Sequence, residues 1–196
     1  SRQEHVVPHI GTTAKLSLDP DGNVGLRNKT CPPPNYAYRE EALQVVEEMR
    51  QTANDPERRL RIEVFDNKLD VRGFFQYATS TQFATQHSYQ RHLLYVLGLS
   101  MAEDGGLVLA WKEKVRHDLV RPTTVIQRWG ADVITSYSHG NLFPAFVPSE
   151  AVEMPARDFE AYIRVMPHAE YPSGSACLCT TYREYQDAYT EQFYNG

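Results

Sequence analysis

Cysteine is scarce in this chain of 196 residues, which contains three. Three cysteines are too few for a disulfide-stapled scaffold, so the fold must depend on a hydrophobic core. Cys177 and Cys179 lie two positions apart, which is too close for an ordinary bridge between them. Either one could pair with Cys31 and leave one odd thiol. Three free thiols are the alternative that the sequence leaves open.

The chain also lacks a long basic run, a marked excess of positive charge and long apolar stretches. Its net charge is −5, so we expect no nucleic-acid binding. No stretch approaches the roughly 18 apolar residues of a membrane span, so we expect no such span. Hydrophobic residues nevertheless make up 41% of the chain. This composition predicts a folded protein with one substantial domain or two small ones.

The first 35 residues have the composition of an irregular arm. Residues 19–23 (Asp-Pro-Asp-Gly-Asn) favour a turn, and residues 32–34 (three prolines) favour extended backbone. Asn28 begins an Asn-Lys-Thr pattern that matches an N-glycosylation acceptor. Together with the cysteines, this pattern favours a secreted or luminal glycoprotein, although an unused acceptor is equally compatible. The chain begins at Ser1 without Met or an apolar leader, which is typical of a processed or excerpted sequence.

Beyond the arm, apolar residues recur at three- and four-residue spacing and predict a mainly α fold. No convincing series of alternating strands is found, and we expect residues 36–196 to form one helical domain. Leu60–Val64 could be a short strand or a turn, and residues 130–155 are predicted to be loop. Gly105 and Gly106 are expected to interrupt a helical pattern, and Pro122 to end one at the residue before it. The predicted helices cover residues 39–52, 71–83, 88–103, 107–120, 123–129, 156–165 and 175–193.

Two short strings carry the chemistry. The first runs from Lys114 to Pro122 and places Arg121 seven positions after the lysine, so both could lie on one helix face. The second is Pro172-Ser173-Gly174-Ser175, a tight turn that leads into a predicted helix. Arginine offers a planar fork to two oxygens, and free N–H groups at a helix start favour an anion. Each string alone is most often a solvated face or a plain turn. Their joint occurrence predicts half of a cage for vanadate, phosphate or sulfate.

In this order, the strings resemble the first two of three oxyanion-binding motifs of the vanadium-dependent haloperoxidases. That superfamily includes the type-2 phosphatidic acid phosphatases and the bacterial acid phosphatases. The resemblance covers roughly residues 85–190 and is nearest the soluble haloperoxidase branch. It includes residues 102–114, which resemble the family's helix with an acidic residue, an apolar run and a Trp before the lysine. Residues 167–174 are similar to the segment that precedes Ser and Gly in the family's second motif.

The resemblance implies a helical bundle of the haloperoxidase type, incomplete in this chain. It implies vanadate as the cofactor, held by Lys114, Arg121, Ser173 and Gly174, with peroxide and halide as further partners. Lys114 would polarise the bound peroxide, which the halide then attacks. In the phosphatase relatives the same cage holds phosphate.

This sequence departs from the family pattern at two places. Ser175 stands where the family has an acid–base His, and a hydroxyl is a poor proton acceptor near neutral pH. The third motif, Ser-Arg followed by His, is missing, and Tyr189 stands where that His would fall after Arg183. The chain by itself therefore lacks the residue that bonds vanadium or attacks phosphorus, and we expect no metal ligand in it. All seven histidines precede Pro172: His5, His9, His87, His92, His117, His139 and His168.

Three hypotheses follow for function. Another chain or a missing C-terminal segment could complete the half-site for peroxide-dependent halide oxidation. The chain could instead be a degenerate homologue, a pseudoenzyme with an assembly role in an extracellular or luminal complex. An acid phosphatase is the third. His117 is a weaker candidate for the missing acid–base group, and simple packing is its alternative reading.

The remaining patterns favour structural roles. Cys177 and Cys179 have no second cysteine pair, so we expect no zinc site. Tyr182, Tyr185 and Tyr189 recur at helical spacing and predict a packing face.

Overall fold

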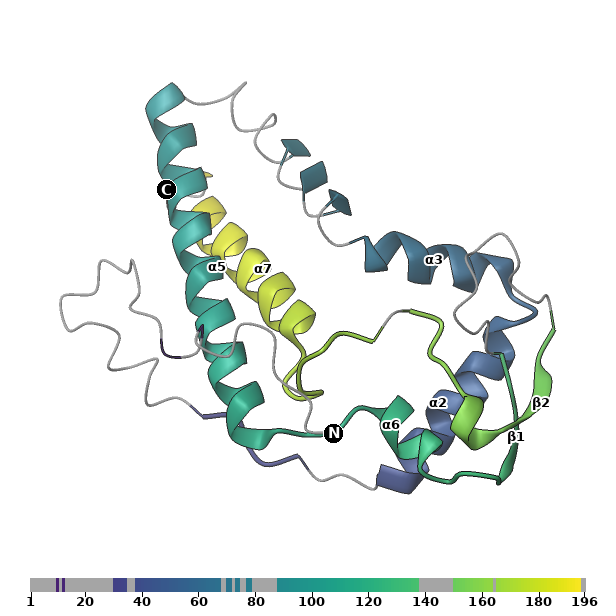
Figure 1. The fold of residues 1–196 in the computed structure, drawn as a ribbon. Coiled ribbons are helices and arrows are strands. Elements are labelled where there is room, and N and C mark those ends of the chain that lie inside the picture. The colour runs from purple at the N-terminus through teal and green to yellow at the C-terminus, as the bar shows by residue number, and fades with distance from the viewer. Residues whose placement is uncertain are drawn as a thin grey trace. The chain divides into compact units, whose positions relative to one another are not determined.

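The computed structural model describes residues 10, 12, 30–34, 38–67, 70–71, 73–74, 77–78, 88–137, 150–163 and 165–194, and the statements below concern these residues. Most of them are helical, which confirms the predicted mainly α fold (Figure 1).

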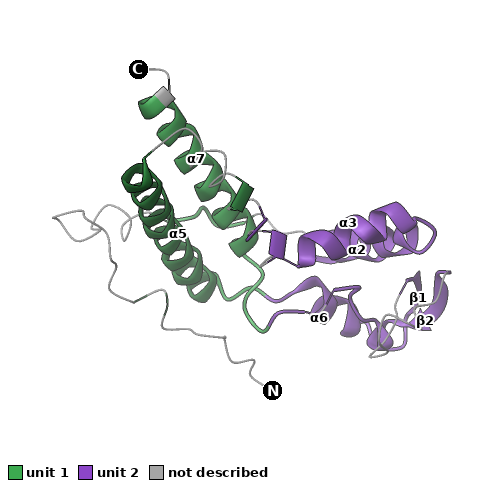
Figure 2. Cartoon of the chain, turned by 90° about the horizontal axis from the view of Figure 1, so that it is seen from above, with its two compact units in different colours: residues 1–34, 75–119, 167–196 green, residues 35–74, 120–166 purple. Residues whose placement is uncertain are grey.

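The chain divides into two compact units that alternate along the sequence (Figure 2). Unit 1 combines residues 1–34, 75–119 and 167–196, and unit 2 combines residues 35–74 and 120–166. The predicted limits of a 1–35 arm and a 36–196 domain stay predictions.

Unit 1 is built on two long helices that lie side by side, α5 (Tyr89–His117) and α7 (Gly174–Tyr194) (Figures 1 and 2). Their shared core contains Tyr95 of α5 and Tyr189 of α7, whose rings meet edge to face with centroids 4.9 Å apart. Tyr185 packs on the same core, and its hydroxyl donates to the carbonyl of Tyr95 at 3.1 Å. The predicted tyrosine packing face on the last helix is therefore confirmed.

Helix α5 differs from the prediction at two points. Gly105 and Gly106 do not interrupt it. The absent side chain of Gly106 leaves room for α7, since a Cβ there would lie 2.7 Å from Oγ1 of Thr181. The helix also ends at His117 rather than at residue 120. Asp118 adopts a left-handed conformation (φ 46°), and its N–H closes the last turn on the carbonyl of Lys114 at 2.9 Å.

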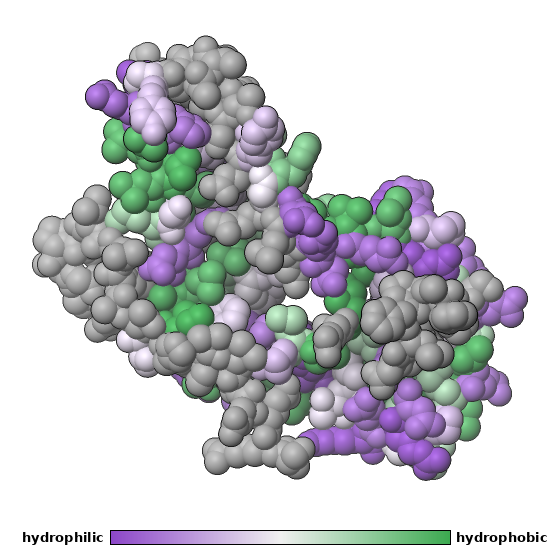
Figure 3. All heavy atoms as spheres, turned by 45° about the horizontal axis from the view of Figure 1, so that its top comes forward, coloured by the Kyte–Doolittle hydropathy of each residue, from purple (hydrophilic) through white to green (hydrophobic). Residues whose placement is uncertain are grey.

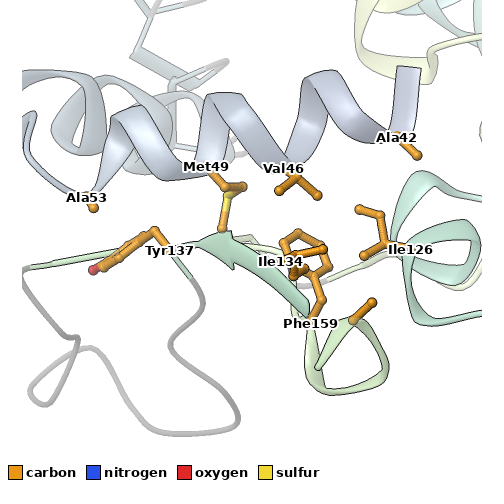
Figure 4. Packing of buried hydrophobic residues seen from close by; sticks show 9 residues of the cluster. Ala42, Val46, Met49, Ala53, Ile126, Ile134, Tyr137 and Phe159 are labelled. Carbon is orange, nitrogen blue, oxygen red and sulfur yellow. The ribbon is translucent and has the colours of Figure 1, made fainter. Parts of the chain in front are cut away.

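The elements of unit 2 are α2 (Tyr38–Thr52), α3 (Pro56–Asp66), α6 (Pro122–Gln127), β1 (Val133–Ser136), β2 (Val152–Pro155) and the 3-10 helix η3 (Ala156–Asp158). Of these, α2, α6, the 3-10 helix and the small antiparallel sheet pack around one apolar cluster, and α3 belongs to the unit without a buried residue in that cluster. In Figure 4, Val46 and Met49 of α2 point toward β1, with Ile134 and Phe159 close by. The buried hydroxyl of Ser136 donates to the carbonyl of Val46 at 3.0 Å and ties β1 to α2.

Three local predictions in unit 2 were wrong. Leu60–Val64 is helical within α3, because Asp55 accepts a hydrogen bond from the N–H of Arg58 at 2.8 Å and Pro56 starts the helix. Residues 130–155 are not all loop, since β1 pairs with β2 in the register Val133 to Pro155. The helix expected over residues 156–165 is limited to the three residues of η3, and the backbone is extended again at Phe159.

The expectation that no stretch resembles a membrane span also needs correction. Among the described residues, one helical stretch, Tyr89–Gln127, is long and apolar enough to cross a membrane by length and composition. About 28% of its most apolar window is buried. Leu93, Leu94 and Leu97 are exposed on α5, and Figure 3 shows apolar surface alongside polar surface. A core helix of a soluble protein passes the same test, so this finding carries no conclusion about a membrane.

Candidate oxyanion site

The end of α5 meets the start of α7 at Gly174. A Cβ on this glycine would lie 3.3 Å from the ring of Trp111 and 3.8 Å from Cε of Lys114. The structure thus brings together two of the predicted cage residues, Lys114 and Gly174, from positions 60 residues apart. The absence of a side chain at Gly174 permits this close approach.

Lys114 is buried, with 1% of its surface exposed. Its ammonium donates to the carbonyls of Ala169 at 2.7 Å and Glu170 at 3.2 Å. The N–H of Glu170 in turn donates to the carbonyl of Leu119 at 3.0 Å. Lys114 therefore holds the segment that leads into α7, and its aliphatic stem reaches this segment beside Gly174.

Ser173 caps the start of α7. Its hydroxyl accepts a hydrogen bond from the N–H of Ala176 at 3.2 Å, and its carbonyl accepts from the N–H of Cys177 at 3.1 Å. The N–H groups of Gly174 and Ser175 belong to the first helical turn, which has no acceptors within its own helix. Ser175 is exposed. This helix start can therefore offer N–H donors to an anion.

Arg121, the remaining predicted cage residue, belongs to unit 2. It directly precedes α6, and its carbonyl accepts from the N–H groups of Thr124 and Val125 at 3.0 and 3.3 Å. The expectation that Lys114 and Arg121 share one helix face is wrong, because α5 ends at His117. The four-residue cage itself stays a prediction.

A buried ionic cluster lies at the end of α5, and the sequence interpretation had missed it. Glu113 is fully buried and accepts hydrogen bonds from the N–H of Cys31 at 2.8 Å and from Nε of Arg116 at 3.0 Å. Burial raises the pKa of the Glu113 carboxyl, but the hydrogen bonds from Arg116 and Cys31, with the charges of Arg116 and Lys112, outweigh it and leave the pKa lowered. Arg116 also donates to the carbonyl of Cys31 at 2.6 Å. Glu113 and Arg116 thus hold the two backbone polar groups of one residue, Cys31, in the N-terminal segment.

His117 belongs to this cluster. Its Nε2 lies 3.6 Å from the Glu113 carboxylate and 2.9 Å from the Arg116 guanidinium, and its ring meets that of Tyr171 edge to face. Tyr171 also donates to the carbonyl of Pro32 at 3.0 Å. The spacing of Glu113, Arg116 and His117 at i, i+3 and i+4 is the signal that could have identified the cluster from sequence.

Three other candidate residues complete the placement. His168 lies in the segment before α7 and packs on the ring of Trp111, with centroids 5.3 Å apart. His139 and Asn28, the predicted glycosylation acceptor, lie outside the described residues.

These residues do not by themselves fit a vanadate bonded to imidazole. The start of α7 supplies N–H donors, but the ammonium of Lys114 is directed at two carbonyls. No histidine follows His168 in the sequence, and the described residues hold no group of three potential metal ligands. Because these residues do not form a vanadate site by themselves, no reaction step through vanadium is derived from them.

Comparison with known proteins places this geometry in context. The sequence pattern of the VCPO second helical-bundle domain matches residues 94–195, just over half of the chain. A search of the curated proteins finds no match. Among solved structures, the chain is similar to an apo-type bacterial vanadium-dependent chloroperoxidase, with a TM-score of 0.71 and 24% identity. That match covers 94% of this chain and 40% of the chloroperoxidase, so the likeness shows a shared fold over less than half of that protein.

Proposed function

The chain belongs to the family of the VCPO second helical-bundle domain, and on this premise we propose that it carries half of an oxyanion site. Another chain or a C-terminal segment that bears a histidine would complete the site for peroxide-dependent halide oxidation. The observation that carries the proposal is the meeting of Lys114 with Gly174 at the start of α7. Vanadate, as the cofactor, rests on family resemblance.

Each part of the half-site has a distinct task. The N–H groups of Gly174 and Ser175, with the positive end of the α7 dipole, attract the anion. Lys114 fixes the segment before α7 through Ala169 and Glu170, which orients these donors. Arg121 would supply the planar fork for two anion oxygens.

A non-catalytic role is the second candidate, and two observations favour it. Ser175 replaces the acid–base histidine, and the ammonium of Lys114 is already bonded to two carbonyls. A homologue that keeps this fold without catalysis would serve in assembly, in an extracellular or luminal complex. The acid phosphatase alternative needs the same missing histidine, there as the nucleophile, so it too would require the completing segment.

Anion binding is tested by calorimetric titration of the full chain with phosphate and then with vanadate. We expect both to bind, and Arg121→Ala to raise the Kd about 10- to 100-fold, since a charge-assisted hydrogen bond contributes about 1.5–3 kcal/mol. Arg128→Ala is the matched control, because Arg128 is an exposed arginine seven positions further on, and its change should leave the Kd within about twofold. Equal binding by wild type and Arg121→Ala would show that Arg121 is no part of the site.

Catalysis is tested separately, with peroxide, bromide, vanadate and a phenolic dye. The 196-residue chain should be inactive, and activity should require a histidine-bearing third segment. If a protein that contains this segment stays inactive, and Ser175→His does not restore activity, then the assembly role replaces the enzymatic one.

A further inference from the structure

Cys31 is held on the end of α5 by both its backbone N–H and its backbone carbonyl. Its N–H donates to Glu113 at 2.8 Å, and its carbonyl accepts from Arg116 at 2.6 Å. The next carbonyl, that of Pro32, accepts from the hydroxyl of Tyr171 at 3.0 Å. The backbone that carries the Cys31 thiol is therefore fixed against α5 and against the segment that leads into α7.

Cys177 lies on the face of α7 that meets α5. A Cβ on Gly174, three residues earlier, would lie 3.3 Å from the ring of Trp111 in α5, and a Cβ on Gly106 of α5 would lie 2.7 Å from Oγ1 of Thr181, four residues later. Residues at these spacings share one helix face, so Cys177 lies between two points of contact with α5. Cys179 is two positions on, about 200° around the helix, and is exposed.

The two thiols are also close enough to influence each other electrostatically. Burial raises the pKa of the Cys177 thiol, the nearby Cys31 thiol raises it further, and Lys114 acts in the opposite direction. Tyr171, which bonds the Cys31–Pro32 segment, has a pKa raised by burial and then by Cys31, Glu113 and Cys177. Cys31 and Cys177 therefore approach the same place from two elements, 146 residues apart in sequence.

We propose that Cys31 and Cys177 form a disulfide when the protein meets a peroxide, and that this bond fastens the N-terminal segment to the first turns of α7. The thiolate of one cysteine attacks hydrogen peroxide: an S–O bond forms, the O–O bond breaks, and the departing hydroxide takes a proton to leave as water. The second thiol then attacks the sulfenic sulfur, so that the S–S bond forms, the S–O bond breaks and a second water leaves. Two thiols are oxidised and one peroxide is reduced.

The environment predicts the pace of this oxidation. Burial, followed by the charge of Glu113, raises the pKa of the Cys31 thiol, against the opposite effects of Arg116 and Lys112. Both thiols are therefore mostly protonated at neutral pH, and the reaction should accelerate as the pH rises toward 9.

The test is hydrogen peroxide treatment of the reduced full chain at pH 8.5, followed by maleimide labelling and peptide mapping. We expect a cross-linked peptide pair that joins Cys31 to Cys177, while the exposed Cys179 stays outside the cross-link, as a free or singly oxidised thiol. Cys177→Ser should abolish the cross-link, while Cys179→Ser, the matched control, should leave it unchanged.

The same reaction in urea provides the reference. In the unfolded chain, Cys177 and Cys179 should pair with Cys31 about equally, whereas the folded chain should favour Cys177 at least about tenfold. Three free thiols after treatment of the folded chain would overturn the proposal, and so would a folded-state preference no greater than that in urea.

Discussion

Replacement of Gly98 by alanine tests the packing of α5 on α7, the interface that positions the candidate site. A Cβ at residue 98 would overlap the hydroxyl oxygen of Tyr185 and lie 3.0 Å from its Cζ. Real Cβ atoms do not approach other atoms so closely, so the Tyr185 ring must move. That movement breaks its 3.1 Å hydrogen bond to the carbonyl of Tyr95.

The size of the effect follows from three opposing contributions. Alanine in a helix interior gains about 1 kcal/mol over glycine. Overpacking costs about 1–3 kcal/mol, and the lost hydrogen bond costs about 1 kcal/mol. The Gly98→Ala protein should therefore be about 1–3 kcal/mol less stable than the wild type.

Urea unfolding monitored by circular dichroism measures this change, with a double-mutant cycle as the control. Tyr185→Phe removes the hydroxyl oxygen that this Cβ would overlap, so Gly98→Ala should cost at least about 1 kcal/mol less in that background. Gly73→Ala is the matched helical control, because a Cβ there meets nothing within 4 Å, and it should stabilise by about 0.5–1 kcal/mol. If Gly98→Ala stabilises the protein as Gly73→Ala does, then α7 does not pack on α5 in this way.

Two further substitutions test the ionic cluster and a turn. Because the folded state lowers the pKa of Glu113 below its ordinary 4.5, this carboxylate adds stability above pH 4.5 that is lost as the pH falls through the lower folded value. Glu113→Gln should lower the free energy of unfolding by about 1–3 kcal/mol at pH 7, as measured by thermal unfolding. This loss of stability should shrink below pH 4.5. A loss that is independent of pH would contradict the role of Glu113 in holding Cys31. Gly130 has φ +65°, a conformation that alanine rarely adopts. Gly130→Ala should therefore destabilise the protein by about 1–2 kcal/mol, and Gly130→Asn by less. Equal stabilities of the wild type and the two variants would contradict the turn geometry.

The sequence predicted α2 and α7 well because their cues are local. Apolar spacing and the turn at Gly174 located α7, and the break at residues 54–56 marked the end of α2. The uninterrupted α5 could not be predicted, because Gly106 serves a contact with Thr181, 75 positions away. The pairing of β1 with β2 was missed for a similar reason, since each strand has four residues and its partner lies beyond a long intervening segment.

The candidate site was only partly predictable. The two motifs predicted that Lys114 and Gly174 belong to one site. The structure brings Gly174 close to the side chain of Lys114. The direction of the Lys114 ammonium depends on where the carbonyls of Ala169 and Glu170 lie, which no local pattern encodes. The clamp on Cys31 likewise depends on a chain segment more than 80 residues before Glu113.

The most direct test of the oxyanion half-site is a phosphate titration of the ¹⁵N-labelled full chain, followed by NMR. The account predicts that the amide signals of Gly174 and Ser175 shift most and saturate, and that the shifts are lost in Arg121→Ala but kept in Arg128→Ala. Amide signals of Gly174 and Ser175 that stay unmoved while phosphate shifts other residues, or moves none, would contradict the account.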